Sequence, residues 1–123
     1  MPQGGIQIQM SSEQHEISDG TLVVRTTRNG GSRVVALCGE LDLANASTAE
    51  TALEDSLGDD GTPIVVDMRE LEFIDSTGIA LLVSALNHNE NETRISFLPS
   101  PAPEVTRVLE LTGLAERLPL AEA

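Results

Sequence analysis

The sequence of 123 residues contains no lysine, no tryptophan and no tyrosine, and all seven of its basic residues are arginines. It has only two phenylalanines and one cysteine. Without lysine, the chain has neither a P-loop lysine nor the ATP-binding lysine of a protein kinase, and it forms no Schiff base. The scarcity of aromatic side chains argues against binding of single-stranded nucleic acid by base stacking.

Acidic residues outnumber basic residues by 20 to 7, which gives a formal net charge of −13. Proteins that bind nucleic acid need clustered positive charge to neutralise phosphates, so direct nucleic-acid binding is not expected. Binding to an anionic membrane surface is also not expected, because it too requires clustered positive charge. The charge balance therefore argues against both of these partners.

Cys38 has no second cysteine with which to form an internal disulfide. It lies in an apolar run, so we expect a buried, unreactive thiol. Neither His15 nor His88 is spaced from Cys38 as a nucleophile pair or a zinc site requires. No signal peptide pattern and no apolar stretch of about 18 residues is present. We expect a cytoplasmic protein without a metal or cofactor.

The length favours one domain, which we place at residues 20–120. Residues 1–19 are polar and contain no basic residue. They are predicted to be a flexible or accessory N-terminal extension, although the alternation of Ile6, Ile8 and Met10 is also compatible with a short edge strand.

Four segments have the composition of β-strands. Residues 21–27 and 33–38 flank Asn29-Gly30-Gly31, a sequence that readily forms a tight turn, and this pattern predicts a β-hairpin. Residues 64–66 form a short apolar run typical of a buried strand, and residues 93–98 alternate between polar and apolar, as strands do.

Three further segments are predicted to be helices: residues 47–57, a segment that opens at Asp75 and ends by Asn87, and residues 102–112. For the first helix, either a capping box of Ser47 and Glu50 or Asn45 alone is the predicted start. The element order is β-β-α-β-α-β-α. Strands joined through helices form parallel pairs, whereas the hairpin is antiparallel, so the sequence predicts an α/β fold with a mixed sheet.

The segment Asp75-Ser76-Thr77-Gly78 opens the second predicted helix. Short polar side chains are common there simply because they accept hydrogen bonds from the first backbone N–H groups. The same position exposes the Ser76 hydroxyl at the positive end of the helix dipole. A phosphate on Ser76 would place up to about two negative charges beside Asp75. Plain capping and a reversible switch are both compatible with these four residues.

Two kinds of enzyme are disfavoured by what surrounds the candidate residues. Asp67 ends a predicted strand, as the phosphorylated aspartate of a receiver domain does, but receivers also need a lysine. Ser76 is not in a G-x-S-x-G motif, and no histidine is placed to act as its base. One acidic cluster is interpreted as a solvated helix face rather than a metal site: Glu50, Glu54, Asp55, Asp59 and Asp60.

Three stretches, residues 37–46, 64–78 and 108–114, resemble the STAS domain of bacterial anti-sigma factor antagonists in order and spacing. The middle stretch, which contains Asp75-Ser76-Thr77-Gly78, is the most specific. The resemblance implies a STAS-type mixed β-sheet with helices packed mainly on one face. It also implies a protein that binds partners and has no catalytic activity of its own.

The resemblance further implies a partner switch centred on Ser76. The unphosphorylated antagonist would bind an anti-sigma factor and so release the sigma factor. That anti-sigma factor is a histidine-kinase-like ATPase that acts as a serine kinase and phosphorylates Ser76, and a metal-dependent phosphoserine phosphatase reverses the modification. Four residues match neighbours of the phosphorylated serine and are assigned with it to partner binding: Asp42, Asp75, Thr77 and Gly78.

The chain departs from the family at Thr77, where a second serine is common. Some STAS proteins keep the fold but are not kinase substrates. The alternative function is therefore an unphosphorylated STAS interaction subunit of a transporter or a stress-signalling complex.

Overall fold

The computed structural model describes residues 9–11, 14–57, 61–88 and 94–121, which contain seven strands and three α-helices. The strands are β1 (Gln9–Ser11), β2 (Gln14–Asp19), β3 (Leu22–Asn29), β4 (Ser32–Leu41), β5 (Ile64–Asp67), β6 (Leu71–Ile74) and β7 (Ile95–Leu98). The helices are α1 (Ala46–Ser56), α2 (Ser76–His88) and α3 (Pro103–Leu111), followed by a short 3-10 turn, η1 (Leu114–Glu116).

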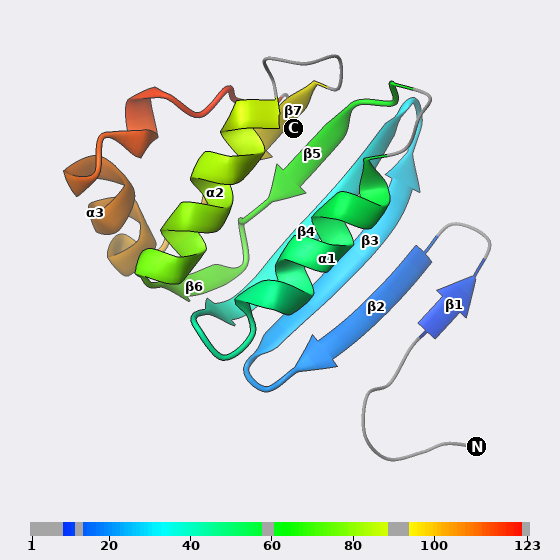
Figure 1. Cartoon of the computed structure of the whole chain (residues 1–123), viewed down its shortest axis with the longest axis horizontal. Helices are drawn as coiled ribbons and strands as arrows, with labels where there is room; N and C mark the ends of the chain where they lie inside the picture. The colour runs from blue at the N-terminus through cyan, green and yellow to red at the C-terminus, as the bar shows by residue number, and fades with distance from the viewer. Residues whose placement is uncertain (1–8, 12–13, 58–60, 89–93, 122–123) are drawn as a thin grey trace.

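All seven strands form one mixed sheet in the order β1-β2-β3-β4-β5-β7, with β6 paired to β4 (Figure 1). The pairs from β1 to β4 are antiparallel. The pairs β4–β5, β4–β6 and β5–β7 are parallel. The predicted α/β class with a mixed sheet is confirmed.

Helices α1 and α2 lie across one face of the sheet, and α3 lies beside α2 at the β6 side (Figure 1). Alternate strand residues on this face are buried, because successive side chains of a strand point to opposite faces. The strand residues in this core are Leu22, Val24, Val35, Leu37, Leu41, Ile64, Val66, Leu71, Ile74, Ile95 and Phe97. The arrangement confirms that the helices pack mainly on one face.

The predicted hairpin is confirmed as β3 and β4. These strands pair from Leu22↔Gly39 to Asn29↔Ser32. The turn between them contains Gly30, whose φ of 64° lies in the left-handed region that glycine adopts at low cost. The pairing fixes the longest strand of the sheet, β4, whose C-terminal end leads into the candidate site.

Strand β6 is absent from the sequence prediction. Only residues 68–70 separate it from β5. They form a turn in which Leu71 N–H donates to the Met68 carbonyl at 3.0 Å. The buried Ser100 hydroxyl donates to the Leu71 carbonyl at 2.6 Å and anchors the start of the strand. Strand β6 then continues the sheet alongside β4 and leads directly into α2.

The predicted capping box of Ser47 and Glu50 is not formed at the start of α1. The helix begins at Ala46, so Ser47 lies inside it and does not cap it. Asn45 is the N-cap residue, but its side chain makes no capping bond. Its amide is instead committed to the preceding loop, as described below.

The N-terminal region contributes two strands to the sheet. Strand β2 lies inside the predicted extension, and it pairs with β3 along its whole length. Met10 lies in β1, which pairs with β2, whereas Ile6 and Ile8 are outside the described residues. Residues 14–19 thus extend the sheet beyond β3.

The expectation of a buried Cys38 thiol is wrong. Cys38 is half-buried and lies on the face of the sheet away from α1 and α2, because its neighbour Leu37 occupies the core. Its Sγ atom lies 3.9 Å from Nη1 of Arg25. Partial burial raises the pKa of the thiol, and the nearby Arg25 charge only partly offsets this effect.

Candidate functional site

The candidate site lies at the N-terminal end of α2. Asp75 precedes the helix, and its Oδ1 atom accepts hydrogen bonds from the backbone N–H groups of Thr77 at 2.9 Å and Gly78 at 3.1 Å. Ser76 is the first helical residue and is exposed. The structure therefore confirms that Asp75 caps the helix, and it leaves the neighbouring Ser76 facing solvent. The switch stays a prediction.

The loop at residues 42–45, between β4 and α1, lies beside the start of α2 (Figure 1). Leu43 N–H donates to Oδ2 of Asp75 at 3.2 Å, and Asp75 N–H donates to the Leu41 carbonyl at 3.2 Å. The Asp75 carboxylate thus uses one oxygen for α2 and the other for the loop. Two segments more than 30 residues apart in the sequence are joined at the exposed serine.

Asp42 belongs to the same loop and is half-buried. Its Oδ1 atom accepts a hydrogen bond from Ala44 N–H at 3.0 Å. The predicted partner-binding residues Asp42, Asp75, Ser76 and Thr77 are therefore brought to one end of the molecule, where both α1 and α2 begin (Figure 1).

Asn45 holds this loop in shape, a role that the sequence analysis did not assign to it. Its buried side-chain amide accepts a hydrogen bond from Asp42 N–H at 3.0 Å and donates one to the Glu40 carbonyl at 3.0 Å. A buried amide that spans both ends of a loop fixes the backbone between them. The sequence signal was an asparagine just before a helix, which is equally typical of an ordinary N-cap.

Gly78 is buried in the first turn of α2, against β4 and β6. A Cβ atom at this position would lie 2.6 Å from a side-chain carbon of Ile74 and 3.0 Å from two carbons of Leu41. Only glycine allows the helix to approach the strands this closely without a shift of its neighbours. Gly78 therefore allows the first turn of α2, which contains Ser76, to lie close to β4 and β6.

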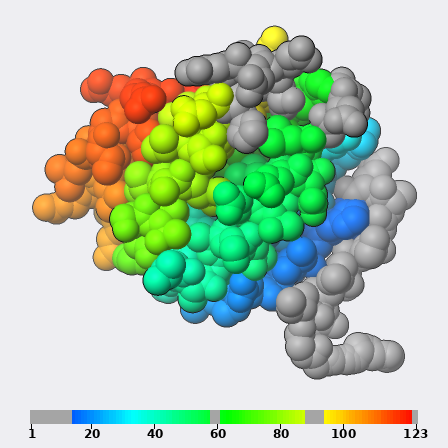
Figure 2. All heavy atoms as spheres, in the orientation of Figure 1, coloured from blue at the N-terminus to red at the C-terminus, as the bar shows by residue number. Residues whose placement is uncertain are grey.

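Two large apolar side chains are exposed in the segments that lead into α1 and α2. Leu43 has 77% of its surface exposed, and Phe73, at the end of β6, has 39% exposed. A groove of about 190 Å³ between α1 and α2 begins beside the serine and is lined by Thr77, Ala46 and Glu50 among others. Figure 2 shows α1 and α2 side by side on one face of the molecule.

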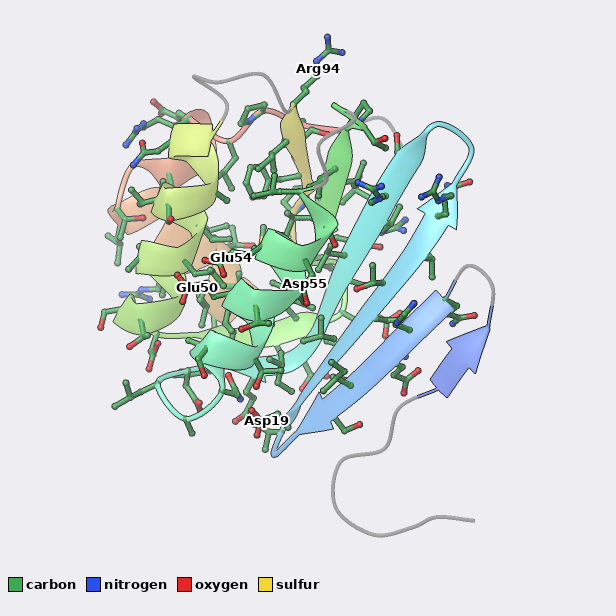
Figure 3. All side chains as sticks on the ribbon, turned by 45° about the vertical axis from the view of Figure 1, so that its right-hand side comes forward. Asp19, Glu50, Glu54, Asp55 and Arg94 are labelled. Carbon is green, nitrogen blue, oxygen red and sulfur yellow. The ribbon has the colours of Figure 1, made fainter. Side chains whose placement is uncertain are left out.

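All the charged side chains of α1 are acidic. Glu50, Glu54 and Asp55 are exposed, which agrees with the predicted solvated face (Figure 3). Glu50 borders the groove described above, and Glu54 lines a second hollow between α1 and α2. Asp59 and Asp60 lie outside the described residues. In the part of the chain that is described, no three His, Cys, Asp or Glu side chains converge as a metal site would require.

The family model of the STAS domain matches residues 23–123. The chain belongs to the STAS domain family. Its match to the family covers β3 through to the C-terminus and includes the whole candidate site.

Two anti-sigma factor antagonists are similar to the chain in sequence. The chain is 29% identical over 104 residues to an anti-sigma-B factor antagonist of Staphylococcus aureus, covering 82% of this chain and 94% of that protein. It is 30% identical over 64 residues to the anti-sigma-F factor antagonist RsfB of Mycobacterium tuberculosis. That match spans 52% of each chain, so this chain aligns with only about half the length of RsfB.

A solved structure shows the same fold. The crystal structure of an anti-sigma factor antagonist from Mycobacterium paratuberculosis superposes with a TM-score of 0.74, at 25% identity, and covers 86% of this chain and 90% of that one. The STAS fold expected from the sequence is therefore confirmed. Among the described residues, no helix is long and apolar enough to span a bilayer.

Proposed function

We propose that this STAS protein is an anti-sigma factor antagonist that binds a kinase-type anti-sigma factor, and that phosphorylation of Ser76 ends the binding. The observation that carries the proposal is an exposed serine at the first position of α2, held beside a loop with an exposed leucine. The names of the relatives support the antagonist role, and the position of Ser76 supports the switch.

The surroundings of Ser76 explain why a phosphate would act on a partner rather than on the fold. A helix N-terminus normally offers free N–H groups to an anion. Here the Thr77 and Gly78 N–H groups already donate to Asp75, so a phosphate on Ser76 finds them occupied. Up to about two new negative charges then face outward beside the carboxylates of Asp75 and Asp42.

The proposed docking surface consists of Asp42, Leu43, Asp75, Ser76 and Thr77. Leu43 supplies the apolar anchor, since interfaces gain most from a few well-buried side chains near their centre. The carboxylates supply electrostatic complementarity to a basic partner surface. Gly78 is buried, so we assign it a packing role beneath this surface rather than a direct contact.

The phosphorylation cycle follows the family pattern. The anti-sigma factor, a histidine-kinase-like ATPase, transfers the γ-phosphoryl group of ATP to Oγ of Ser76 and releases ADP. A phosphoserine phosphatase restores the hydroxyl by hydrolysis. We place this exchange in the cytoplasm, and we assign no catalytic step to the STAS protein itself.

The experiment compares binding of four proteins to a kinase-type anti-sigma factor from the same organism: the wild type, Ser76→Ala, Ser76→Asp and Ser18→Asp. Ser18 is exposed on β2, so Ser18→Asp adds the same charge outside the residues assigned to the docking surface. We expect Ser76→Asp to bind at least about tenfold more weakly than Ser18→Asp, because the new side chain adds bulk, and a charge that loses its hydration, where the Ser76 hydroxyl would face the partner.

Incubation with ATP and the kinase, followed by mass spectrometry, completes the test. We expect one phosphate on the wild type and none on Ser76→Ala. Binding of Ser76→Asp at wild-type strength, together with no phosphate on Ser76, would refute the switch. That result favours the alternative, an unphosphorylated STAS subunit of a transporter or stress-signalling complex.

A further inference from the structure

The face of the sheet away from α1 and α2 is hollowed in two adjoining places. One hollow of about 480 Å³ lies over β3, β4 and β5, and another of about 620 Å³ lies over β3, β4 and β6. The first is lined by 11 residues and the second by 10, and only Arg69 is common to both. Among the described residues, no helix contributes to either lining. The face is therefore about as large as one side of a standard protein interface, which has about 20–30 residues.

The strands at the centre of this face have the sequence of strands that are buried on both sides. Strand β4 pairs in parallel with β5, and β5 pairs in parallel with β7. Parallel strands are usually covered on both faces, and they then contain near-continuous apolar runs. Residues 34–38 of β4 and 64–66 of β5 are such runs. The half-buried side chains that they present on the face without helices are Val34, Ala36, Cys38 and Val65. This composition favours a further layer that covers the face.

Charged side chains on this face are neutralised in pairs around β4 and β5. Arg25 donates from Nε to Oε1 of Glu16 at 3.2 Å. Arg69 donates to Asp67 from both Nε and Nη2, each at 3.0 Å. The further acidic residues in the two linings, as far as the chain is described, belong to the second hollow. The centre of the face is thus close to neutral in a chain with a net charge of −13, so repulsion between two copies is weakest there.

The register of the sheet places these charges in one row across the strands. Arg25 of β3 pairs with Ala36 of β4, and Ala36 pairs with Asp67 of β5. Ala36 therefore lies at the centre of the row, with a positive charge on one side and a negative charge on the other. A two-fold axis along β4, between two such faces, places Arg25 of each copy opposite Asp67 of the other. The Nη groups of Arg25 have donors for this contact, because Nη1 makes only a long contact of 3.9 Å with the weakly accepting Sγ of Cys38.

We propose that two copies of this chain associate through this face as a two-fold symmetric dimer. The two sheets pack face to face with the helices outside, so each sheet is covered on both sides. The apolar side chains of β4 and β5 form the centre, and Arg25 binds Asp67 of the other copy at two symmetric places. The occupant is a second copy because the row of charges is complementary to itself. None of the residues assigned to the docking surface around Ser76 lines either hollow, so the dimer is independent of the proposed switch.

The test is sedimentation velocity of the full chain, recorded by interference because the chain has no tryptophan or tyrosine. We expect a reversible monomer–dimer equilibrium with a dissociation constant of about 100 µM or tighter. Arg25→Glu and Asp67→Arg each place like charges opposite one another in the homodimer, so each should weaken it at least about tenfold. An equimolar mixture of the two variants should dimerise at about wild-type strength, since the facing charges are then opposite in sign at both places.

Two control variants make the same charge changes away from the face. Arg107→Glu on α3 and Asp55→Arg on α1 change exposed residues that line neither hollow, and we expect both to leave the dimer unchanged. Arg25→Glu and Asp67→Arg also break an ion pair within their own chain, so far-UV circular dichroism must show that each is folded. Recovery in the mixture is the second safeguard, because mixing two misfolded chains restores no interface.

Four results would overturn the proposal. The first is a wild-type chain that stays monomeric up to about 500 µM. The second is a series of species larger than the dimer, since a two-fold interface closes on itself. The third is a dimer that Arg25→Glu and Asp67→Arg weaken no more than the controls do. The fourth is a mixture of these two variants that associates no more strongly than either alone. Ser76→Asp should dimerise as the wild type does, so failure here is separable from failure of the switch.

Discussion

Replacing Asp75 with alanine tests the geometry of the site most sharply, because this carboxylate joins α2 to the loop at residues 42–45. The substitution removes two hydrogen bonds to the first turn of α2 and one to Leu43. Loss of an N-cap side chain costs about 0.5–2 kcal/mol. The exposed Leu43 N–H group can bond to water instead, so its loss adds little. We expect the free energy of unfolding to fall by about 1–2 kcal/mol.

The assay is urea unfolding followed by far-UV circular dichroism, since the chain has no tryptophan or tyrosine to report by fluorescence. The control is Asp55→Ala, which removes the same charge from an exposed position near the C-terminal end of α1. A negative charge there opposes the helix dipole, so the control should be neutral or slightly stabilising. Equal stability of Asp75→Ala and Asp55→Ala would refute the assigned capping and bridging role.

Three further predictions concern packing and ionisation. Gly78→Ala should lower the free energy of unfolding by about 1 kcal/mol, because the contacts of its new Cβ with Ile74 and Leu41 outweigh the helical preference for alanine; a rise in stability would contradict it. Burial alone would raise the pKa of Asp67, but the hydrogen bonds and charge of Arg69 lower it below 3.8. The associated stability is present above that pH and is lost as the pH falls further; carboxyl NMR titration should show a higher midpoint in Arg69→Gln. Partial burial should keep the pKa of the Cys38 thiol, followed by its alkylation rate, above that of a cysteine in a short peptide measured alongside, and a lower midpoint would be inconsistent with partial burial.

The sequence predicted well those strands and helices whose pattern of apolar and turn residues matches the face that they bury in the fold. The β3–β4 hairpin combines two β-rich runs with Asn29-Gly30-Gly31, and α2 combines an apolar face with Asp75 at its start. Strand β6 was missed because it is short, follows β5 almost at once, and leaves Glu72 and Phe73 both exposed, so it shows no alternation. Strand β2 was missed because it is largely polar.

The sequence predicted which residues belong to the candidate site, but it did not predict the hydrogen bonds that join them. Asp42 and Asp75 were both assigned to it, yet the bond between Asp75 and Leu43 N–H depends on the packing of β4 beside β6. An apolar residue in a connector gives no sign of whether it enters the core or faces a partner.

The central claim is that a phosphate on Ser76 controls the interaction with the anti-sigma factor. The most direct measurement is the dissociation constant of that complex, obtained by titration calorimetry with the unphosphorylated protein and with the same protein phosphorylated only at Ser76. The account predicts a complex at least about tenfold weaker after phosphorylation. Equal dissociation constants for the two forms would contradict it.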